Sequence, residues 1–380
     1  MSNYFADNIR FYRKKSKLTQ TELADKLFVA PQTVSKWESG ISSPDLDRLC
    51  AMSDIFGISL DTLIRSATEA SREAYIAIDG GGTKTKFVLF NDSGEVIDSI
   101  LLGGTNPNSY RLEAAEKTLA EGIDKLISRG IRICGCFAGI SGASVGENKE
   151  RLTSFLKSRY PYINFRIEGD IHNVINSAGN FDKCIAVISG TGSVVYGYDG
   201  RSLRRAGGWG YLFDEAGSGF DIGRDLFRYC LACEDGFAKK TELYYRMRDE
   251  IGSEIFDNLS SIYSKGKDYI ASFSRVAFEF FKKGDDIAVG IIAKTVRRLS
   301  ELICQVANDF DCGKNVVISG GLVYENSPII VILNEHIGND FKIVVPEMPP
   351  IFGAAVKCIK IFGGKYNADA FEENFKKSLQ

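Results

Sequence analysis

Hydrophobic residues follow two different spacings along the chain, and the change between them divides it in two. Up to about residue 65, apolar residues recur every three or four positions between polar breaks, which predicts five short helices. From Tyr75 onward, short apolar runs alternate with longer helical patterns, which predicts strands alternating with helices. Residues 66–74, SATEASREA, are small and charged without an apolar period. We therefore expect the domain boundary there, as a loose tether or a helical extension.

The clearest helix signals lie in the first region, residues 1–65. Thr19 is expected to cap the second helix, and Glu22 completes a capping box three residues later. The third helix is expected from about Pro31 to Ser39 with Gly40 ending it, because proline suits a first turn and glycine suits the position after a last one. Apolar residues spaced to pack these two helices together are Leu23, Ala24, Leu27, Val34 and Trp37.

The third helix leaves a polar face that suits DNA. Its outward residues are predicted to be Gln32, Thr33, Ser35 and Lys36. Amides and a lysine at the start of an exposed helix suit base edges, whereas Thr19 and Gln20 suit backbone phosphates. The segment from Leu18 to Ile64 resembles the Cro/repressor-type helix-turn-helix family, which implies five helices, a reading helix at 31–39 and binding as a dimer. A five-helix interaction module without DNA binding is the alternative.

Glycine turns follow strand-like runs at three places in the second region. Residues 75–90, YIAIDGGGTKTKFVLF, and 184–200, CIAVISGTGSVVYGYDG, each predict a strand, a glycine turn and a returning strand; residues 315–323, NVVISGGLV, predict a strand and paired glycines. Glycines let backbone amides approach anionic oxygens, so such turns suit phosphates. The first turn is neither a Walker A loop nor a dinucleotide fingerprint, because a strand follows it rather than a helix. The repeated order predicts a duplicated α/β fold.

Four stretches together, IDGGGTK, ISGTGS, GGWGYLFDEAGSGFDIGRD and VISGGLV, are similar to the BadF-type ATPase and N-acetylglucosamine kinase family of the actin-like, hexokinase-like ATPase superfamily. The similarity spans about Tyr75 to Gly363. It implies an α/β body of two ribonuclease-H-like lobes behind the all-α head, with ATP and Mg²⁺ in a cleft that closes on binding. We expect the lobes at residues 75–182 and 183–380, with the last helix, 351–363, packing back on the first lobe.

The glycine turns and the resemblance supply the expected cofactor residues. Those expected against the ATP phosphates are Gly80, Gly81, Gly82, Thr83, Lys84, Ser189, Gly190, Thr191, Gly192 and Ser193, with hydroxyl donors from Thr83, Thr191 and Ser193. Gly320 and Gly321 are expected to let the adenosine lie close to the backbone. Asp79, at a strand end, is expected to hold Mg²⁺ through water, because Mg²⁺ prefers a carboxylate plus retained waters. Tight turns without a ligand are the alternative.

A kinase also needs a carboxylate that accepts the proton of the sugar hydroxyl. Asp170 is the first choice, because hexokinase-like folds put an aspartate at this strand end; a helix cap is its alternative role. The N-acetylglucosamine kinases carry an aspartate after their Ser-Gly loop where this chain has Ser144, and Glu147 comes three residues later. Their Gly-Asp-Glu-Gly-Ser stretch corresponds to residues 214–218, where the acidic pair stands one place earlier. Amino-sugar specificity therefore does not carry over directly.

The same resemblance implies the substrate residues. Expected contacts are Asn106, Ser144, Gly207, Gly208, Trp209, Asp214 and Glu215. Trp209 offers a flat apolar face of the kind that sugars stack on, and a buried core position is its alternative. Asp214 and Glu215 bind sugar hydroxyls or form the solvated start of a helix.

Composition describes an ordinary globular protein, with 44% hydrophobic and 25% charged residues and a net charge of −2. That charge argues against non-specific adhesion to nucleic acid or membranes. No apolar run approaches the roughly 18 residues of a membrane span, and the N-terminus lacks the apolar core of a signal peptide. We therefore expect a cytoplasmic protein with reduced thiols. Cys230 and Cys233 are expected to be buried thiols, because no second pair follows at zinc-ribbon spacing.

Three functions fit these patterns. The first is a homodimeric, sugar-responsive transcriptional regulator that phosphorylates an amino sugar with ATP, with closure of the cleft changing the spacing of the paired heads. The second keeps ATP and sugar binding but has lost turnover. The third is a BadF-type activator of a radical dehydratase, which holds an iron–sulfur cluster through cysteines after a glycine-rich loop. Residues 188–200, ISGTGSVVYGYDG, contain no cysteine, which disfavours the third function.

Overall fold

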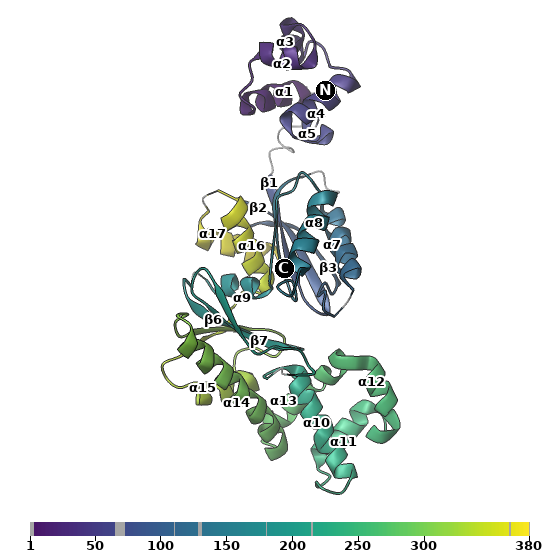
Figure 1. Ribbon diagram of the computed structural model, residues 1–380, viewed down its shortest axis with the longest axis vertical. Helices are drawn as coiled ribbons and strands as arrows, with labels where there is room; N and C mark the ends of the chain where they lie inside the picture. Colours follow the sequence, from purple (N-terminus) through teal and green to yellow (C-terminus); the bar gives the residue numbers. More distant parts are fainter. Residues whose placement is uncertain are drawn as a thin grey trace. The chain divides into compact units, whose positions relative to one another are not determined.

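The computed structural model describes residues 4–64, 73–109, 111–127, 131–179, 181–213, 216–364 and 366–379 (Figure 1). The chain forms two compact units, Met1–Asp170 with Ala354–Gln380, and Ile171–Gly353. The second unit therefore begins twelve residues before the expected lobe boundary at 183, and most of the last long helix belongs with the first unit. The expected linker lies almost wholly outside the described residues. No described helix is long and apolar enough to cross a membrane.

Five short helices form the head, as the apolar spacing predicted. They are α1 (Tyr4–Lys15), α2 (Gln20–Leu27), α3 (Pro31–Glu38), α4 (Leu46–Phe56) and α5 (Leu60–Ile64). Thr19 caps α2: its hydroxyl accepts the Glu22 N–H at 3.1 Å, and the Glu22 carboxylate accepts the Thr19 N–H at 2.7 Å. The capping box is therefore confirmed. The five residues expected between α2 and α3 are all buried in the head core.

The end of α3 has the backbone pattern that glycine favours. Gly40 has φ +72°, and its N–H donates to the Trp37 carbonyl at 3.1 Å. The Ile41 N–H donates to the Lys36 carbonyl at 2.9 Å, which completes a Schellman motif. Pro31 occupies the first turn, where a missing N–H loses no helical hydrogen bond. The predicted limits of the reading helix are thus confirmed to within one residue.

A buried ion pair ties α3 to α1 and α2. The Glu38 side chain is 2% exposed and accepts hydrogen bonds from Arg13 at 2.5 and 2.9 Å and from Gln20 at 2.8 Å. Burial raises the pKa of Glu38, but the hydrogen bonds and positive charge outweigh burial, so the pKa lies below its ordinary value of 4.5. The carboxylate is therefore ionised at neutral pH and holds three helices in register.

The body contains two five-stranded sheets of the same design. The first has the order β3-β2-β1-β4-β5 and the second β10-β9-β6-β7-β8. In each, the central strand pairs antiparallel with the strand that follows its glycine turn and parallel with a later strand. The duplicated fold predicted from the repeated motif is therefore confirmed. The strands are β1 (Glu73–Gly80), β2 (Lys84–Asn91), β3 (Val96–Gly103), β4 (Arg132–Ile140), β5 (Phe165–Glu168), β6 (Cys184–Ser189), β7 (Ser193–Tyr198), β8 (Leu203–Ala206), β9 (Asn315–Ser319) and β10 (Lys342–Val344).

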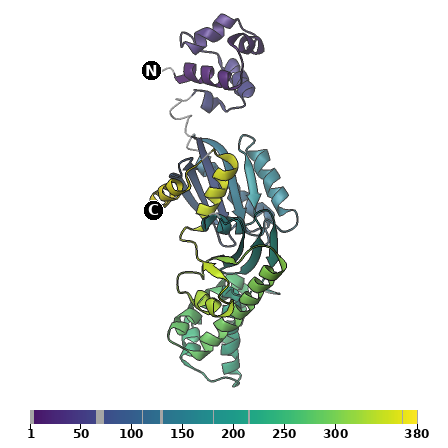
Figure 2. The same ribbon diagram turned by 90° about the vertical axis from the view of Figure 1, so that its left-hand side faces the viewer.

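Helices cover both faces of the first sheet. One face packs on α7 (Leu112–Ile127) and α8 (Asn148–Arg159). Figure 2 shows α16 (Pro350–Phe362) and α17 (Ala368–Ser378) in yellow on the opposite face. There the ring of Phe90 meets Phe371 and Phe375 at centroid distances of 5.8 and 6.4 Å. The Cys358 thiol of α16 donates to the Ile76 carbonyl at 3.5 Å, so α16 lies directly on β1.

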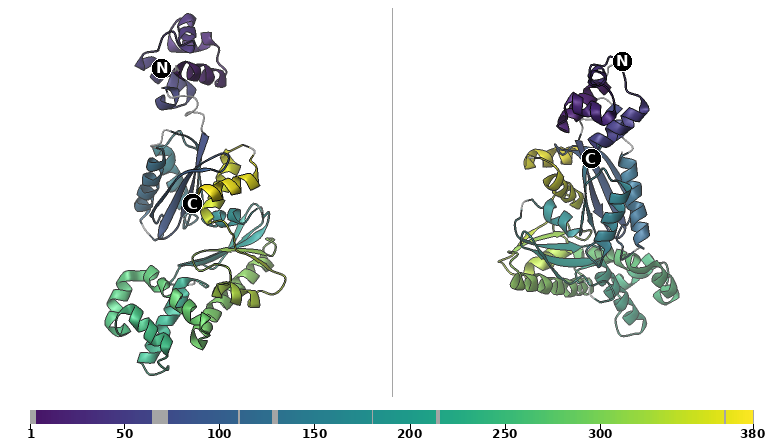
Figure 3. Two further views of the ribbon diagram at one scale, coloured as in Figure 1. Left: turned by 180° about the vertical axis from the view of Figure 1, so that it is seen from behind. Right: turned by 45° about the horizontal axis from the view of Figure 1, so that its top comes forward.

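The second sheet has a larger helical layer. On one face lies α9 (Ile171–Ser177). The other face packs on a helical layer formed largely by α10 (Gly219–Glu234), α11 (Glu242–Ile251), α12 (Ile255–Ser272), α13 (Ser274–Lys282), α14 (Asp286–Asp309) and α15 (Pro328–His336), seen from behind in Figure 3. The helices α10 to α14 make up most of the described residues between 216 and 310. Gly266, with φ +70°, kinks α12.

We predict that Glu38→Gln destabilises the head by about 3 kcal/mol, because it leaves the Arg13 guanidinium without its buried counter-ion. Chemical denaturation, followed by circular dichroism, measures the loss. Since the pKa of Glu38 is lowered by folding, its contribution is present above pH 4.5 and disappears as pH falls through the folded pKa. Arg48→Gln, which breaks the exposed pair with Asp45, is the control and should change stability by less than about 1 kcal/mol. Equal losses in the two variants would contradict the role of Glu38.

Candidate functional site

The first glycine turn, Gly81–Thr83, joins β1 to β2 in the first unit. The Gly81 N–H donates to the Lys84 carbonyl at 3.0 Å, and the Thr105 N–H donates to the Gly81 carbonyl at 3.0 Å. A Cβ on Gly80 would lie 2.4 Å from the Thr105 hydroxyl oxygen, so the loop after β3 fits only against glycine there. Thr83 and Lys84 are exposed, while Asp79 is half-buried at the strand end. The turn predicted for phosphate thus presents backbone and two polar side chains outward.

A cluster of amide side chains lies next to this turn. Asn106 donates to the Ser141 hydroxyl at 3.3 Å and accepts the Asn108 N–H at 2.8 Å. Asn148 donates to the Gly142 carbonyl at 3.1 Å and to the Asn108 side chain at 3.3 Å. The sequence prediction included Asn106 but missed Asn108 and Asn148. Only the repeated asparagine in Asn-Pro-Asn hinted at the first, and nothing local pointed to the second.

The expected acidic and hydroxyl residues nearby are at least partly exposed. Ser144 is exposed in the turn that follows β4, and so is Glu147 at the start of α8. Asp170 is half-buried between β5 and α9, the strand-end position that the resemblance implies. The structure records no side-chain cap by Glu147 on α8.

The second glycine turn, Gly190–Gly192, joins β6 to β7 in the second unit. The Ser189 hydroxyl donates to the Gly217 carbonyl and the Ser193 hydroxyl to the Ala216 carbonyl, each at 2.6 Å. Both serines are buried. The Ser193 hydroxyl proton is thus held by a backbone carbonyl 23 residues away, and its expected contact with phosphate stays a prediction. Thr83 and Thr191 are the other expected hydroxyl donors.

The third glycine pair lies directly against the second turn. Gly320 has φ +130°, and a Cβ there would lie 2.2 Å from the Ser189 carbonyl oxygen. The Leu322 N–H donates to that same carbonyl at 3.2 Å. The structure therefore brings together two of the three predicted glycine loops within one unit. Glycine is required at position 320 because the two backbones touch.

A cavity of about 720 Å³ opens beside this contact. The loop after β9 forms one side of the cavity, with Gly321 and Leu322 at its rim, and α13 with the residue that follows it forms the other side. Its remaining lining residues are Ser274, Arg275, Phe278, Glu279, Lys282, Lys283 and Tyr324. Lys282 lies 5.8 Å above the ring of Tyr324. The cavity thus combines apolar walls with basic side chains, which suits a flat, apolar ring that carries a negatively charged group.

The sequence prediction missed these cavity walls. Arg275, Glu279 and Lys282 recur at three- and four-residue spacing and mark a charged face on α13. That face was the available signal.

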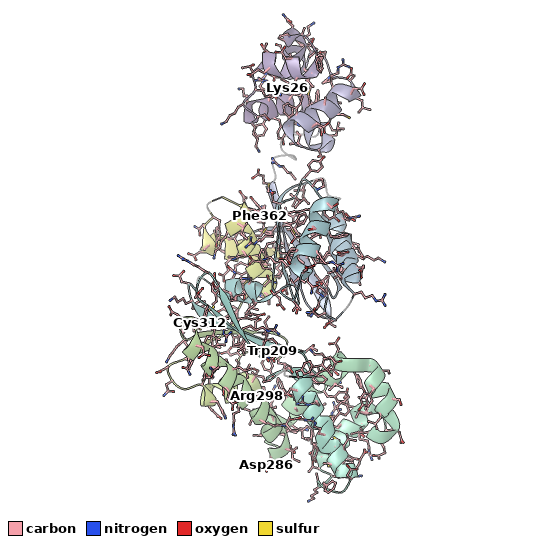
Figure 4. The ribbon with its side chains drawn as sticks, in the orientation of Figure 1. Lys26, Trp209, Asp286, Arg298, Cys312 and Phe362 are labelled. Carbon is pink, nitrogen blue, oxygen red and sulfur yellow. The ribbon has the colours of Figure 1, made fainter. Side chains whose placement is uncertain are left out.

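The expected substrate loop lies between β8 and α10. Gly207 and Gly208 have φ values of +64° and +65°, and a Cβ on Gly208 would lie 2.5 Å from the Ser193 carbonyl oxygen. Trp209, labelled in Figure 4, is 62% exposed, so the alternative of a buried core position is wrong. The Arg205 guanidinium lies 4.7 Å from its ring centroid. Asp214 and Glu215 lie outside the described residues.

On the head, the polar face of α3 is presented as expected. Gln32, Ser35 and Lys36 are exposed and Thr33 is half-buried. The two residues expected at phosphates are engaged elsewhere. The Thr19 hydroxyl donates to the Glu22 carboxylate at 2.9 Å, and the Gln20 amide donates to Glu38 at 2.8 Å. Contact of these two side chains with DNA phosphates stays a prediction.

Two sequence profiles match the two parts of the chain. The profile of the BadF/BadG/BcrA/BcrD ATPase family matches residues 76–357, and a helix-turn-helix profile matches residues 9–63. The chain belongs to the BadF/BadG/BcrA/BcrD ATPase family. Both resemblances inferred from the motifs are confirmed. This family member carries a helix-turn-helix head in front of its ATPase body.

Known proteins resemble each part. An N-acetylmuramic acid/N-acetylglucosamine kinase of Clostridium acetobutylicum is 33% identical over 236 residues, covering 59% of this chain and 76% of the kinase. An uncharacterized HTH-type transcriptional regulator of Bacillus subtilis is 34% identical over 117 residues, covering 30% of this chain and 97% of that protein. The crystal structure of a candidate N-acetylglucosamine kinase of Chromobacterium violaceum matches with a TM-score of 0.59 and 18% identity, over 75% of this chain and 98% of that one. The likeness confirms the fold of the ATPase body.

The paired cysteines of this ATPase body lie inside the helical layer. Cys230 and Cys233 are 0% and 4% exposed on α10. Burial raises the pKa of the Cys230 thiol to about 12, so the group stays neutral at physiological pH. Their expected role as buried thiols is confirmed.

We predict that Gly320→Ala destabilises the ATPase body by about 2–4 kcal/mol, because the new Cβ adds backbone strain and meets the Ser189 carbonyl. Denaturant unfolding of the second unit measures the loss. Gly338→Ala is the matched control, since Gly338 also has a positive φ of +77° but has open space around its Cβ position. It should lose only about 1 kcal/mol. If both variants lose the same amount, the contact at Ser189 does not constrain the fold.

Proposed function

We propose that the protein is a sugar-responsive transcriptional regulator. Its head binds DNA, and its body binds Mg-ATP and an amino sugar of the N-acetylglucosamine or glucosamine type and phosphorylates that sugar. The observation that carries the proposal is the meeting of two glycine loops at the rim of a 720 Å³ cavity in the second unit. Family membership and the kinase relative support the same activity.

The nucleotide is assigned to that cavity and its rim. Phe278 and Tyr324 supply flat apolar walls for a base, and Arg275 and Lys282 supply positive charge. The close approach of Gly320 to Ser189 brings the Gly190–Gly192 backbone beside Gly321, and the absence of side chains on these glycines leaves room for a phosphate. The phosphates are therefore assigned to this turn, and Thr191 is the hydroxyl available there.

Magnesium is assigned to Asp79, whose side chain fits it. The residue is half-buried at the end of β1 and supplies one carboxylate beside an exposed glycine turn. A single carboxylate with waters and phosphate oxygens is the usual set for Mg²⁺ in phosphoryl transfer. When bound, the ion neutralises phosphate charge.

The sugar is assigned to the amide cluster of the first unit. Asn106, Asn108 and Asn148 supply donors and acceptors that match sugar hydroxyls and an acetamido group. A stacking role for the exposed ring of Trp209, in the second unit, stays a prediction. Asp170 is assigned as the base that takes the proton from the attacking hydroxyl.

A second candidate function is a sensor without turnover, and one observation favours it. Ser144 stands where the resemblance expects a sugar-contacting aspartate, and the structure leaves it exposed. A serine forms weaker hydrogen bonds to sugar hydroxyls than a carboxylate does, so it holds the attacking hydroxyl less firmly for transfer. Both candidates share ligand binding, and they differ only in whether Asp170 supports transfer.

The head is assigned to operator DNA through α3, with the chain acting as a homodimer. One helix-turn-helix module covers one half-site, so specific binding needs two. Ligand binding to the body then changes the affinity of the paired heads for DNA, and linkage requires DNA to change ligand affinity by the same factor.

We predict that Mg-ATP with an amino sugar raises the melting temperature, because ligands that bind only the folded state stabilise it. ADP release, measured by a coupled assay over N-acetylglucosamine, glucosamine and glucose, should depend on the sugar. Asp170→Asn should reduce turnover by about 10² to 10⁴ while the melting shift remains. Asp340→Asn, which alters an exposed pair with Lys314, should behave as the wild type. Ligand binding without turnover would select the sensor, and a flat response to Mg-ATP would reject both candidates.

We also predict that Gln32→Ala weakens binding to DNA selected by the wild-type protein from a random library, by about 1–3 kcal/mol at one base position. The exposed amide at the start of α3 is placed to read a base edge. Binding to unrelated DNA should be unchanged, as measured by fluorescence anisotropy at fixed salt. Arg48→Gln on α4 serves as the control. A uniform loss on all sequences would instead assign Gln32 to the phosphates.

A further inference from the structure

The segment that precedes α10 holds the glycine turn Gly190–Gly192 in place through hydrogen bonds. The carbonyls of Ala216 and Gly217 accept the hydroxyls of Ser193 and Ser189, each at 2.6 Å. These bonds lie at the two ends of the turn, where β6 ends and β7 begins. The position of residues 216–217 therefore fixes the position of the turn.

The first residues of α10 bind the same turn from the other direction. The Gly219 N–H donates to the Gly190 carbonyl at 2.8 Å, and the Phe220 N–H donates to the Thr191 carbonyl at 3.2 Å. Ser218 is fully buried and caps the helix by accepting the Asp221 N–H at 3.0 Å. Turn and helix start thus form one hydrogen-bonded piece.

One side chain from a distant helix holds this piece in place. Thr295 of α14 is 3% exposed; its hydroxyl oxygen accepts the Gly217 N–H at 2.7 Å, and its proton is donated to the Asp221 carboxylate. Asp221 also pairs with Arg224. A Cβ on Gly217 would lie 2.7 Å from Leu299 of the same helix, so α14 touches the segment at this point. Thr295 therefore joins Gly217 and Asp221 through one hydroxyl.

We propose that Thr295 is a positioning residue for nucleotide phosphates. It acts through Gly217 and the serine hydroxyls on the turn Gly190–Gly192, and this inference rests on the nucleotide site proposed above. The cavity beside Gly321 and Tyr324 is built by α13 and the 320–324 loop, whereas Thr295 bonds to Gly217 and Asp221, so loss of its hydroxyl acts first on the phosphate turn. Loss of the hydroxyl should then lower the affinity for a nucleotide more, the more phosphates the nucleotide carries.

The hydroxyl chemistry supplies matched variants. Thr295→Val keeps the shape of the side chain but neither accepts from Gly217 nor donates to Asp221. Thr295→Ser restores both bonds. Ser300→Ala is the control, because Ser300 is also buried on α14 but its hydroxyl donates only to Arg297 of its own helix.

The test is isothermal titration calorimetry, which measures the affinity of each purified full-length variant for Mg-ATP, Mg-ADP and adenosine. Thr295→Val should bind Mg-ATP about tenfold more weakly than the wild type, and it should bind adenosine with unchanged affinity. The substitution leaves the buried Gly217 N–H without its acceptor, and Gly217 supports the phosphate turn. Thr295→Ser should restore the ratio of ATP to adenosine affinity, and Ser300→Ala should not change it. The ratio separates positioning from a general loss of stability, which weakens both ligands alike.

An equal loss for ATP and adenosine in Thr295→Val, or no loss for either, overturns the inference. If that variant does not fold, Asp221→Asn is titrated instead, since it keeps an acceptor oxygen but weakens the bond from Thr295. The ratio should then fall about threefold, and an unchanged ratio overturns the inference. If the wild-type protein binds Mg-ATP and adenosine, and Thr295→Val binds Mg-ATP with the same affinity, only this inference fails. If the wild type binds no Mg-ATP, the proposed nucleotide site itself fails.

Discussion

The contact between the backbones at Ser189 and Gly320 is the constraint on which the candidate site depends. A Cβ on Gly320 would lie 2.2 Å from the Ser189 carbonyl, a separation that no side chain permits. Because the approach is backbone to backbone, it places both glycine loops side by side at one end of the sheet. The same carbonyl accepts the Leu322 N–H, which aligns the loop that forms the cavity rim. Phosphate recognition and cavity formation therefore share one contact.

Hydroxyl groups then convert that contact into a rigid support. Ser189 and Ser193 donate to consecutive carbonyls, and those carbonyls belong to a segment held by Thr295. Each of these side chains is buried, so each hydrogen bond forms without competition from water. The glycines let a ligand approach the backbone of the turn, and the hydroxyls fix where that backbone lies. A turn made only of glycines would lack a fixed shape, because glycine has the largest backbone freedom.

In the head, a buried ion pair rather than a set of hydroxyl groups fixes the functional element, which is α3. Glu38 lies at the end of α3 and binds side chains from α1 and α2, so the reading helix is fixed by charge as well as by its apolar face. The Glu38 carboxylate also binds Gln20, which the sequence analysis placed at a DNA phosphate. An amide in the first turn of α2 suits either a phosphate or a neighbouring carboxylate, and only the packed structure brings Glu38 within 2.8 Å.

Local chemistry was enough to determine the head helices, the capping box at Thr19, the strand–turn–strand repeats and their glycines. These features depend on residues within about one turn or one hairpin of each other, where spacing and backbone freedom decide the outcome. Tertiary structure alone decided which carbonyl accepts the Ser193 hydroxyl, how exposed Trp209 is, and which residues line the cavity. It also placed the Asn148 side chain within hydrogen-bond distance of Asn108. Each depends on groups that are far apart in the chain, such as Thr295 and Gly217, 78 residues apart. Sequence spacing carries no information on such pairs, because the folding of the intervening chain sets their distance.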